Sequence, residues 1–201
     1  MNKYLLSICL MLALGFVACE ESGSSTVVNS ETVIENAEAM APVANKAVIS
    51  TIIDSIASPR RQLYGTMDNV VLTINYGSPA MKGRQVWGEL VPFDEIWRTG
   101  ANEATSFEVA DDVMIGDQKL RAGKYGLFTI PGENDWTLIF NSVSDQWGAY
   151  QYDESKDVLR TKVVPVATET ASETMEFEVD GDNVVILWDK LAVPFSVTRA
   201  K

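Results

Sequence analysis

Histidine is absent from this chain of 201 residues. Because histidine is the usual general base, a common zinc ligand and a member of the usual nucleophilic triad, its absence excludes the commonest form of each. Any catalysis would depend on carboxylates, lysine, tyrosine or hydroxyl groups. We therefore expect no metal centre and no cofactor.

Cysteine is nearly absent too, because Cys9 and Cys19 are the only two. Cys9 lies inside an apolar run near the start of the chain, and Cys19 lies where that run ends. The rest of the chain cannot form a disulfide, so its stability must come from a hydrophobic core.

Positive charge is scarce: the chain has 16 basic and 28 acidic residues, and its formal net charge is −12. This acidic excess disfavours nucleic acids and anionic membrane surfaces as partners. The apolar run at residues 4–17 is shorter than the roughly 20 residues that a membrane-spanning helix needs. These features are typical of a soluble domain outside the cytoplasm.

The first residues have the pattern of a targeting segment. A short basic start precedes the apolar run at residues 4–17, and Ala18 and Cys19 follow it. Residues 16–19 resemble a bacterial lipobox, although Phe16 stands where leucine is usual. We predict a lipoprotein signal peptide at residues 1–18, and lipidation of Cys19 by diacylglycerol and palmitate, which would anchor the protein to a membrane. The alternative is an ordinary secretory peptide.

Glu20 and Glu21 follow the cysteine directly. A residue other than aspartate after the lipidated cysteine resembles a signal for release to the outer membrane. An acidic pair resembles the surface-export signal of some Gram-negative lipoproteins. We therefore predict an outer-membrane lipoprotein that faces the periplasm or the cell surface.

Residues 19–57 are predicted to form a flexible or partly helical tether. Residues 20–30 are rich in serine, glycine and glutamate, a composition typical of a linker. Residues 44–56 are apolar enough for a helix, with Val48 and Ile52 on one side. Such a helix could dock on the domain or the segment could fluctuate, and the sequence favours neither alternative.

Residues 58–201 carry the signals of a β-domain. Apolar and polar residues alternate at 70–76 and at 175–180, as strands with one buried face require. We predict an antiparallel β-sandwich or barrel-like domain with one or two short helices, and residues 82–91 could form one short helical turn. About 140 residues suffice for a single hydrophobic core.

Five short runs occur in a fixed order along this domain. They are Lys82-Gly83-Arg84, Trp87-Gly88, Trp97-Arg98-Thr99-Gly100-Ala101-Asn102, Ala122-Gly123-Lys124-Tyr125 and Gln146-Trp147-Gly148-Ala149-Tyr150. Together they resemble a bacterial family known as domain of unknown function 2911, over residues 58–197. The resemblance implies a secreted or lipid-anchored β-domain. It implies no activity, because the family has no assigned reaction.

Polar and aromatic residues gather in three runs, at residues 82–87, 97–105 and 146–154. If the runs converge, they form a site with aromatic platforms and directional hydrogen-bonding groups. Sugars bind to such sites, because their C–H faces stack on aromatic rings while amides and guanidinium groups contact their hydroxyls. The candidate ligand-binding residues are Arg84, Trp97, Arg98, Asn102, Glu103, Gln146, Trp147 and Tyr150.

The same residues also fit a structural role. Tryptophans in β-domains pack in the core more often than they contact a ligand. Arg98 could pair with Asp94, Glu95 or Glu103 rather than with a ligand. The sequence leaves both roles open.

Carboxylates are abundant enough to suggest two further sites. Glu103 with Asp153 or Glu154 could serve in glycoside hydrolysis if the two groups face each other at roughly 5–10 Å. Residues 180–183, Asp-Gly-Asp-Asn, carry oxygen ligands of the kind that calcium prefers. The same residue types are typical of hairpin turns, and we favour the turn.

We expect a non-catalytic, lipid-anchored binding or envelope-accessory domain, with a glycan as the candidate ligand. The alternatives are a carboxylate-dependent glycan hydrolase and a structural partner of another envelope protein. Exposed aromatic residues favour binding, a facing pair of buried carboxylates favours hydrolysis, and a flat apolar patch favours a structural partner.

Overall fold

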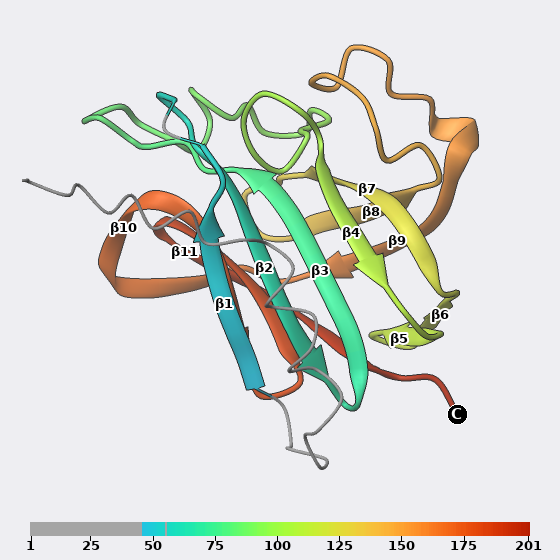
Figure 1. The fold of residues 1–201 in the computed structure, drawn as a ribbon. Helices are drawn as coiled ribbons and strands as arrows, with labels where there is room; N and C mark the ends of the chain where they lie inside the picture. Colours follow the sequence, from blue (N-terminus) through green and yellow to red (C-terminus); the bar gives the residue numbers. More distant parts are fainter. Residues whose placement is uncertain (1–45, 55) are drawn as a thin grey trace, which may run out of the picture. The chain divides into compact units, whose positions relative to one another are not determined.

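The computed structural model describes residues 46–54 and 56–201 (Figure 1). The predicted signal peptide at residues 1–18, the lipidation site Cys19 and most of the predicted tether at 19–57 lie outside these residues. Within the described part of the chain, no helix has the length and apolar character needed to cross a membrane.

Two antiparallel sheets form the described domain. The larger has seven strands in the order β1-β2-β3-β4-β7-β8-β9, and the smaller has four in the order β10-β11-β5-β6. The strands are β1 (Lys46–Ile52), β2 (Arg60–Met67), β3 (Val70–Gly77), β4 (Thr105–Val109), β5 (Val113–Ile115), β6 (Gln118–Leu120), β7 (Gly123–Ile130), β8 (Trp136–Asn141), β9 (Asp157–Val163), β10 (Val166–Asp180) and β11 (Asn183–Arg199). The sheets do not close into a barrel, which confirms the predicted all-β sandwich.

Strand β3 shows how the sequence pattern forms the core. Leu72, Ile74 and Tyr76 are buried, whereas the residues between them are exposed or half-buried. The Tyr76 ring lies 4.8 Å from the Phe177 ring of β10, measured between centroids. The buried row of the larger sheet therefore packs against the smaller sheet, as the alternation predicted.

Four tryptophans join both sheets to the loop between β3 and β4. Trp136 of β8 and Trp188 of β11 contact Trp87 at centroid distances of 4.9 and 5.7 Å, and Trp97 stacks on Trp188 at 6.0 Å. The Trp87 contacts are edge-to-face, so the positive edge of one indole meets the negative face of another. The indole N–H groups of Trp87, Trp136 and Trp188 are buried without a hydrogen-bond acceptor among the described residues.

The hairpin of β10 and β11 turns at residues 180–183, where Asp180 pairs with Asn183. Gly181 has a φ of 57°, a left-handed conformation that glycine adopts without strain. The predicted turn is confirmed. No group of three or more His, Cys, Asp or Glu side chains within residues 46–54 and 56–201 is placed to hold a metal ion.

Residues 46–52, for which a helix was one alternative, form strand β1 instead. The strand pairs antiparallel with β2, with Ser50 opposite Leu63 and Ile52 opposite Arg61. Its β-branched residues favour an extended strand, and the edge of β2 supplies the partner that local sequence cannot reveal. The larger sheet therefore begins before the predicted domain boundary at Ser58.

The helical turn predicted within residues 82–91 is wrong, because this segment consists of turns and extended residues. Lys82, Gly83 and Gly88 have positive φ angles of 50°, 71° and 86°, which interrupt right-handed helical geometry. A short helical element does occur elsewhere among the described residues, as the 3-10 turn η2 (Glu154–Lys156) between β8 and β9.

Candidate ligand-binding site

The β3–β4 loop (residues 78–104) returns to the sheet through a tightly hydrogen-bonded segment. The backbone amides of Trp97 and Thr129 each donate to the carbonyl of the other, at 2.8 and 2.9 Å. The Thr105 amide donates to the Arg98 carbonyl at 3.1 Å, and the Thr105 hydroxyl donates to the Thr99 carbonyl at 2.8 Å. The Arg98 side chain therefore extends from a fixed backbone.

Two glycines allow this loop to approach β3. The Ala101 amide donates to the Gly77 carbonyl at 3.2 Å. A Cβ atom on Gly77 would lie 2.1 Å from the Ala101 carbonyl oxygen, and one on Gly100 would lie 2.9 Å from the Gly77 carbonyl oxygen. Only residues without a side chain fit at these two positions.

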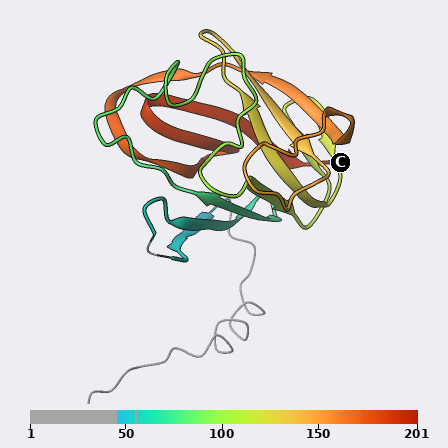
Figure 2. The same cartoon turned by 90° about the horizontal axis from the view of Figure 1, so that it is seen from above.

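The β8–β9 loop (residues 142–156) pairs with the end of the β3–β4 loop. Glu103 and Trp147 form an isolated antiparallel bridge, and the Ala104 amide donates to the Gln146 carbonyl at 2.9 Å. The Gly148 amide donates to the Asn102 carbonyl at 3.0 Å. The two loops lie side by side in both views (Figures 1 and 2). Two of the three polar and aromatic runs predicted to converge are thus in contact.

A polar network braces the base of the β8–β9 loop. The Asp157 carboxylate accepts hydrogen bonds from the Tyr152 hydroxyl at 2.6 Å, Arg160 Nε at 2.7 Å and Asn141 Nδ2 at 2.7 Å. Arg160 Nη2 also donates to the Tyr152 hydroxyl at 2.7 Å. Burial, followed by the bond to Asp157, raises the pKa of Tyr152 to about 12. Sequence analysis missed this network, because its members are spread over residues 141–160 and carry no local motif.

Two large aromatic side chains of this loop are exposed to solvent. Trp147 is 60% exposed and Tyr150 is 87% exposed. Gly148, with a φ of 66°, lies between them, and a Cβ atom there would lie 3.0 Å from the Tyr150 ring. Backbone pairing with residues 102–104 and the polar network around Asp157 fix the loop backbone. Both aromatic side chains are therefore exposed on a segment whose backbone is fixed.

Arg98 is half-buried beside these residues, and no carboxylate in the described part of the chain pairs with it. Its Nε atom is buried without an acceptor, and no described carboxylate oxygen lies within 4.0 Å of its guanidinium group. Burial lowers the pKa of the Arg98 guanidinium, and the nearby Tyr150 phenol acts in the opposite direction. The pairing with Asp94, Glu95 or Glu103 that the sequence allowed is not found.

The remaining predicted residues of the two loops have structural partners. Glu103 forms an ion pair with Arg60 at 3.2 Å, and Asn102 Nδ2 donates to the Ser58 carbonyl at 3.2 Å. Gln146 Nε2 donates to the Val143 carbonyl at 3.1 Å, but Gln146 Oε1 is buried without a donor. Gln146 therefore retains one unused acceptor.

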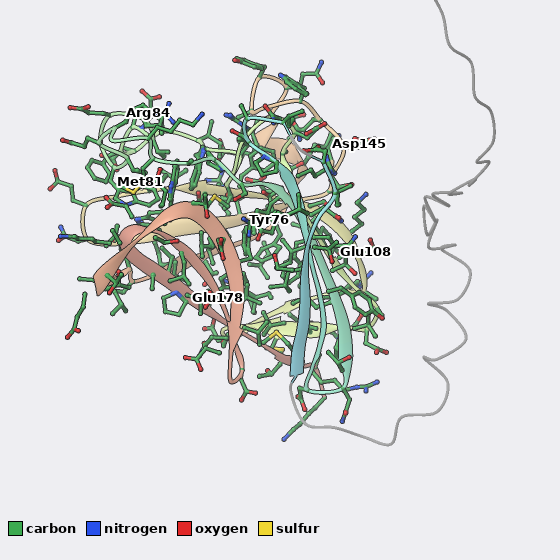
Figure 3. All side chains as sticks on the ribbon, turned by 60° about the vertical axis from the view of Figure 1, so that its left-hand side comes forward. Tyr76, Met81, Arg84, Glu108, Asp145 and Glu178 are labelled. Atoms are coloured by element: carbon green, nitrogen blue, oxygen red, sulfur yellow. The ribbon has the colours of Figure 1, made fainter. Side chains whose placement is uncertain are left out.

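Trp97 and Arg84 are not part of this surface. Trp97 is only 8% exposed, packs in the tryptophan cluster and donates its indole N–H to the Gly100 carbonyl at 3.2 Å. Arg84 donates to the carbonyls of Ala80 and Met81 at 2.7 and 2.9 Å, within the first part of the β3–β4 loop. Figure 3 shows Arg84 and Asp145, the neighbour of Gln146, on opposite sides of the domain.

The carboxylates suggested for hydrolysis are also engaged in structural contacts. Asp153 caps η2 by accepting a hydrogen bond from the Ser155 amide at 2.9 Å, and hydrogen bonding from the Ser155 side chain, followed by this amide, lowers the pKa of the Asp153 carboxyl. Glu154 lies 3.2 Å from Arg160, and Glu103 pairs with Arg60. A general acid needs a raised pKa, so the position of Asp153 does not suit that role.

Residues 58–197 match a family that is described as Protein of unknown function (DUF2911). No match was found among curated proteins or among solved structures. The matching residues make up more than half of the chain and include both loops of the candidate site. The chain therefore belongs to the DUF2911 family, as its spaced motifs predicted.

Proposed function

We propose that this protein is a lipid-anchored binding domain of the outer membrane, and that it binds glycans. The proposed contact residues are Arg98, Trp147 and Tyr150, which we call the paired-loop surface; Gln146, expected from the sequence to contact the ligand, is buried beneath it. The proposed anchor is Cys19, as the lipobox-like residues 16–19 indicate.

The observation that carries this proposal is the exposure of Trp147 and Tyr150 on a braced loop. Leaving a large apolar side chain in water forgoes roughly 1.5–3 kcal/mol of burial free energy. Backbone pairing with residues 102–104 and the network around Asp157 order the loop without burying either ring. A ligand that covers the two rings would recover that free energy.

The guanidinium group beside the rings favours a sugar over a purely apolar ligand. Arg98 is half-buried and has no carboxylate within 4.0 Å among the described residues. Sugar hydroxyls can accept hydrogen bonds from a guanidinium group, and the C–H face of a sugar ring can stack on an indole or a phenol. A glycan would therefore supply an acceptor for Arg98 and cover the aromatic faces.

A screen of immobilised glycans and peptidoglycan fragments tests the proposal. The probe is the mature chain with Cys19→Ser, compared with the same chain carrying Trp147→Ala. Tyr64→Ala is a matched control, because Tyr64 is 46% exposed on β2 and belongs to neither loop. We expect binding that Trp147→Ala abolishes and Tyr64→Ala preserves.

The two alternatives stay predictions. The structural contacts of Glu103, Asp153 and Glu154 make the hydrolase less favoured than a binding domain. A structural partner of another envelope protein would be favoured if the screen found no glycan and the same surface retained a purified envelope protein. Release of reducing ends from a bound glycan, lost in Glu103→Gln, would favour the hydrolase.

A further inference from the structure

We propose that the glycan bound by the paired-loop surface is acidic, with a sugar carboxylate that pairs with the Arg98 guanidinium while the sugar ring stacks on Trp147 or Tyr150. This inference rests on the proposed function and names its ligand class. Its basis is the contrast between Arg98 and the other half-buried arginines of the described domain, Arg60, Arg61 and Arg160, each of which has a carboxylate partner.

Most described arginines already have an anionic or carbonyl partner. Carboxylates lie within 3.3 Å of the guanidinium groups of Arg60, Arg61, Arg160 and Arg199. Arg84 donates to two backbone carbonyls instead. Arg98 has neither kind of side-chain partner in the described part of the chain, although the protein carries 28 acidic residues.

A half-buried cation without a partner is costly, because burial removes part of its hydration and nothing replaces it. The cost is reflected in the lowered pKa of the Arg98 guanidinium. An anion supplied from outside would compensate this charge.

A carboxylate suits the site better than a more highly charged group. One guanidinium binds one carboxylate in a planar, two-pronged geometry. The chain has a net charge of −12, so its overall field repels polyanions and groups with two negative charges more strongly than a single carboxylate. A uronic acid combines one carboxylate for Arg98 with a ring face for the exposed Trp147 and Tyr150.

The test compares uronic-acid oligosaccharides with their methyl esters. Trisaccharides that carry a single galacturonate, glucuronate or mannuronate residue are titrated into the mature Cys19→Ser chain by calorimetry, each beside its methyl ester, which has the same rings but no charge. We expect at least one acid to bind about 10- to 100-fold more tightly than its ester, the range for a hydrogen-bonded charge pair. Raising NaCl to about 0.5 M should lower the affinity for the acid and leave the affinity for the ester unchanged, because salt screens the charge pair.

Four variants show which residues cause the difference between acid and ester. Arg98→Gln should abolish the difference between acid and ester, and Arg98→Lys should retain part of it. Arg121→Gln is the matched control, because Arg121 is exposed, has no carboxylate partner in the described residues and lies outside both loops. Trp147→Ala should weaken acid and ester alike. Thermal unfolding of each variant verifies that it is folded.

Each other outcome overturns the inference. If acid and ester bind equally, the glycan proposal stands and the role of the carboxylate does not. If neither binds while a neutral glycan binds in the immobilised screen, the ligand is not acidic. If a peptide with one terminal carboxylate binds more tightly than every uronate, the ligand is a peptide and the glycan proposal also fails.

Discussion

The amide of Gly148 donates a hydrogen bond to the carbonyl of Asn102 at 3.0 Å, and this contact joins two loops that are distant in sequence. On one side of it, Arg98 extends from the β3–β4 loop without a carboxylate partner among residues 46–54 and 56–201. On the other side, Trp147 and Tyr150 stand exposed on the β8–β9 loop. The candidate site thus depends on backbone pairing rather than on side-chain contacts alone.

Alanine at Gly77 should destabilise the fold strongly. The added Cβ atom would lie 2.1 Å from the Ala101 carbonyl oxygen, so the β3–β4 loop would have to move. We expect a loss of about 3 kcal/mol in the free energy of unfolding, measured with urea. The control is Gly83→Ala: its Cβ meets nothing within 4 Å, but its φ of 71° should cost about 1 kcal/mol. Equal losses of unfolding free energy in Gly77→Ala and Gly83→Ala would contradict the close approach of the β3–β4 loop to Gly77.

Alanine at Arg98 should leave the fold nearly intact. No carboxylate is left without its partner by this change, so we expect the free energy of unfolding to change by less than about 1 kcal/mol. The contrasting variant is Arg160→Ala, which removes two hydrogen bonds from the network of Tyr152 and Asp157. It should cost about 2–3 kcal/mol. A larger loss in Arg98→Ala than in Arg160→Ala would show that Arg98 is a structural residue.

Tyr152 should make stability fall at high pH. Its pKa is raised in the folded state to about 12, so the folded protein holds the phenolic proton more tightly than the unfolded chain does. This contribution is fully present below the unfolded pKa of about 10 and is lost as pH rises through the folded value. Unfolding free energies measured between those two pH values should decline, and Tyr152→Phe should reduce the slope. An unchanged slope in Tyr152→Phe would argue against the prediction.

Changing Cys19 to alanine should abolish lipidation. The lipobox-like residues 16–19 predict that the Cys19 thiol carries diacylglycerol. In the native host, labelled palmitate should enter the wild-type protein and not the variant, and the variant should leave the membrane fraction or accumulate as a precursor. Equal labelling of the two proteins would refute the anchor. Cys9→Ala serves as a control, because Cys9 lies within the predicted signal peptide.

The fold was largely predictable because one buried face leaves a period of two in the sequence. The alternation at residues 70–76 and 175–180 identified strands β3 and β10. The Asp-Gly-Asp-Asn run identified the turn between β10 and β11. Strand β1 was not predictable in the same way. Its apolar, β-branched residues fit a helix face as well as an edge strand, and the choice depends on the free edge of β2.

The site was predictable as a set of residue types, but not in its detail. Residues 97–105 and 146–150 were expected to converge, and their backbones do pair. The burial of Trp97 and the separate position of Arg84 depend on tertiary packing, which no local pattern encodes. The absence of a partner for Arg98 likewise depends on where Glu103 points, and Glu103 points to Arg60.

The most direct test of the proposed function is glycan binding by three matched forms of the mature Cys19→Ser chain. These are the parent, Trp147→Ala and Tyr64→Ala, all measured at one salt concentration against the glycan that gives the strongest signal in the immobilised screen. Stacking and burial on an indole predict a loss of about 1.5–3 kcal/mol, or roughly 10- to 150-fold in Kd, in Trp147→Ala. Tyr64→Ala should bind as the parent does. Equal affinity in Trp147→Ala and the parent, or the absence of any binding glycan, would contradict the account.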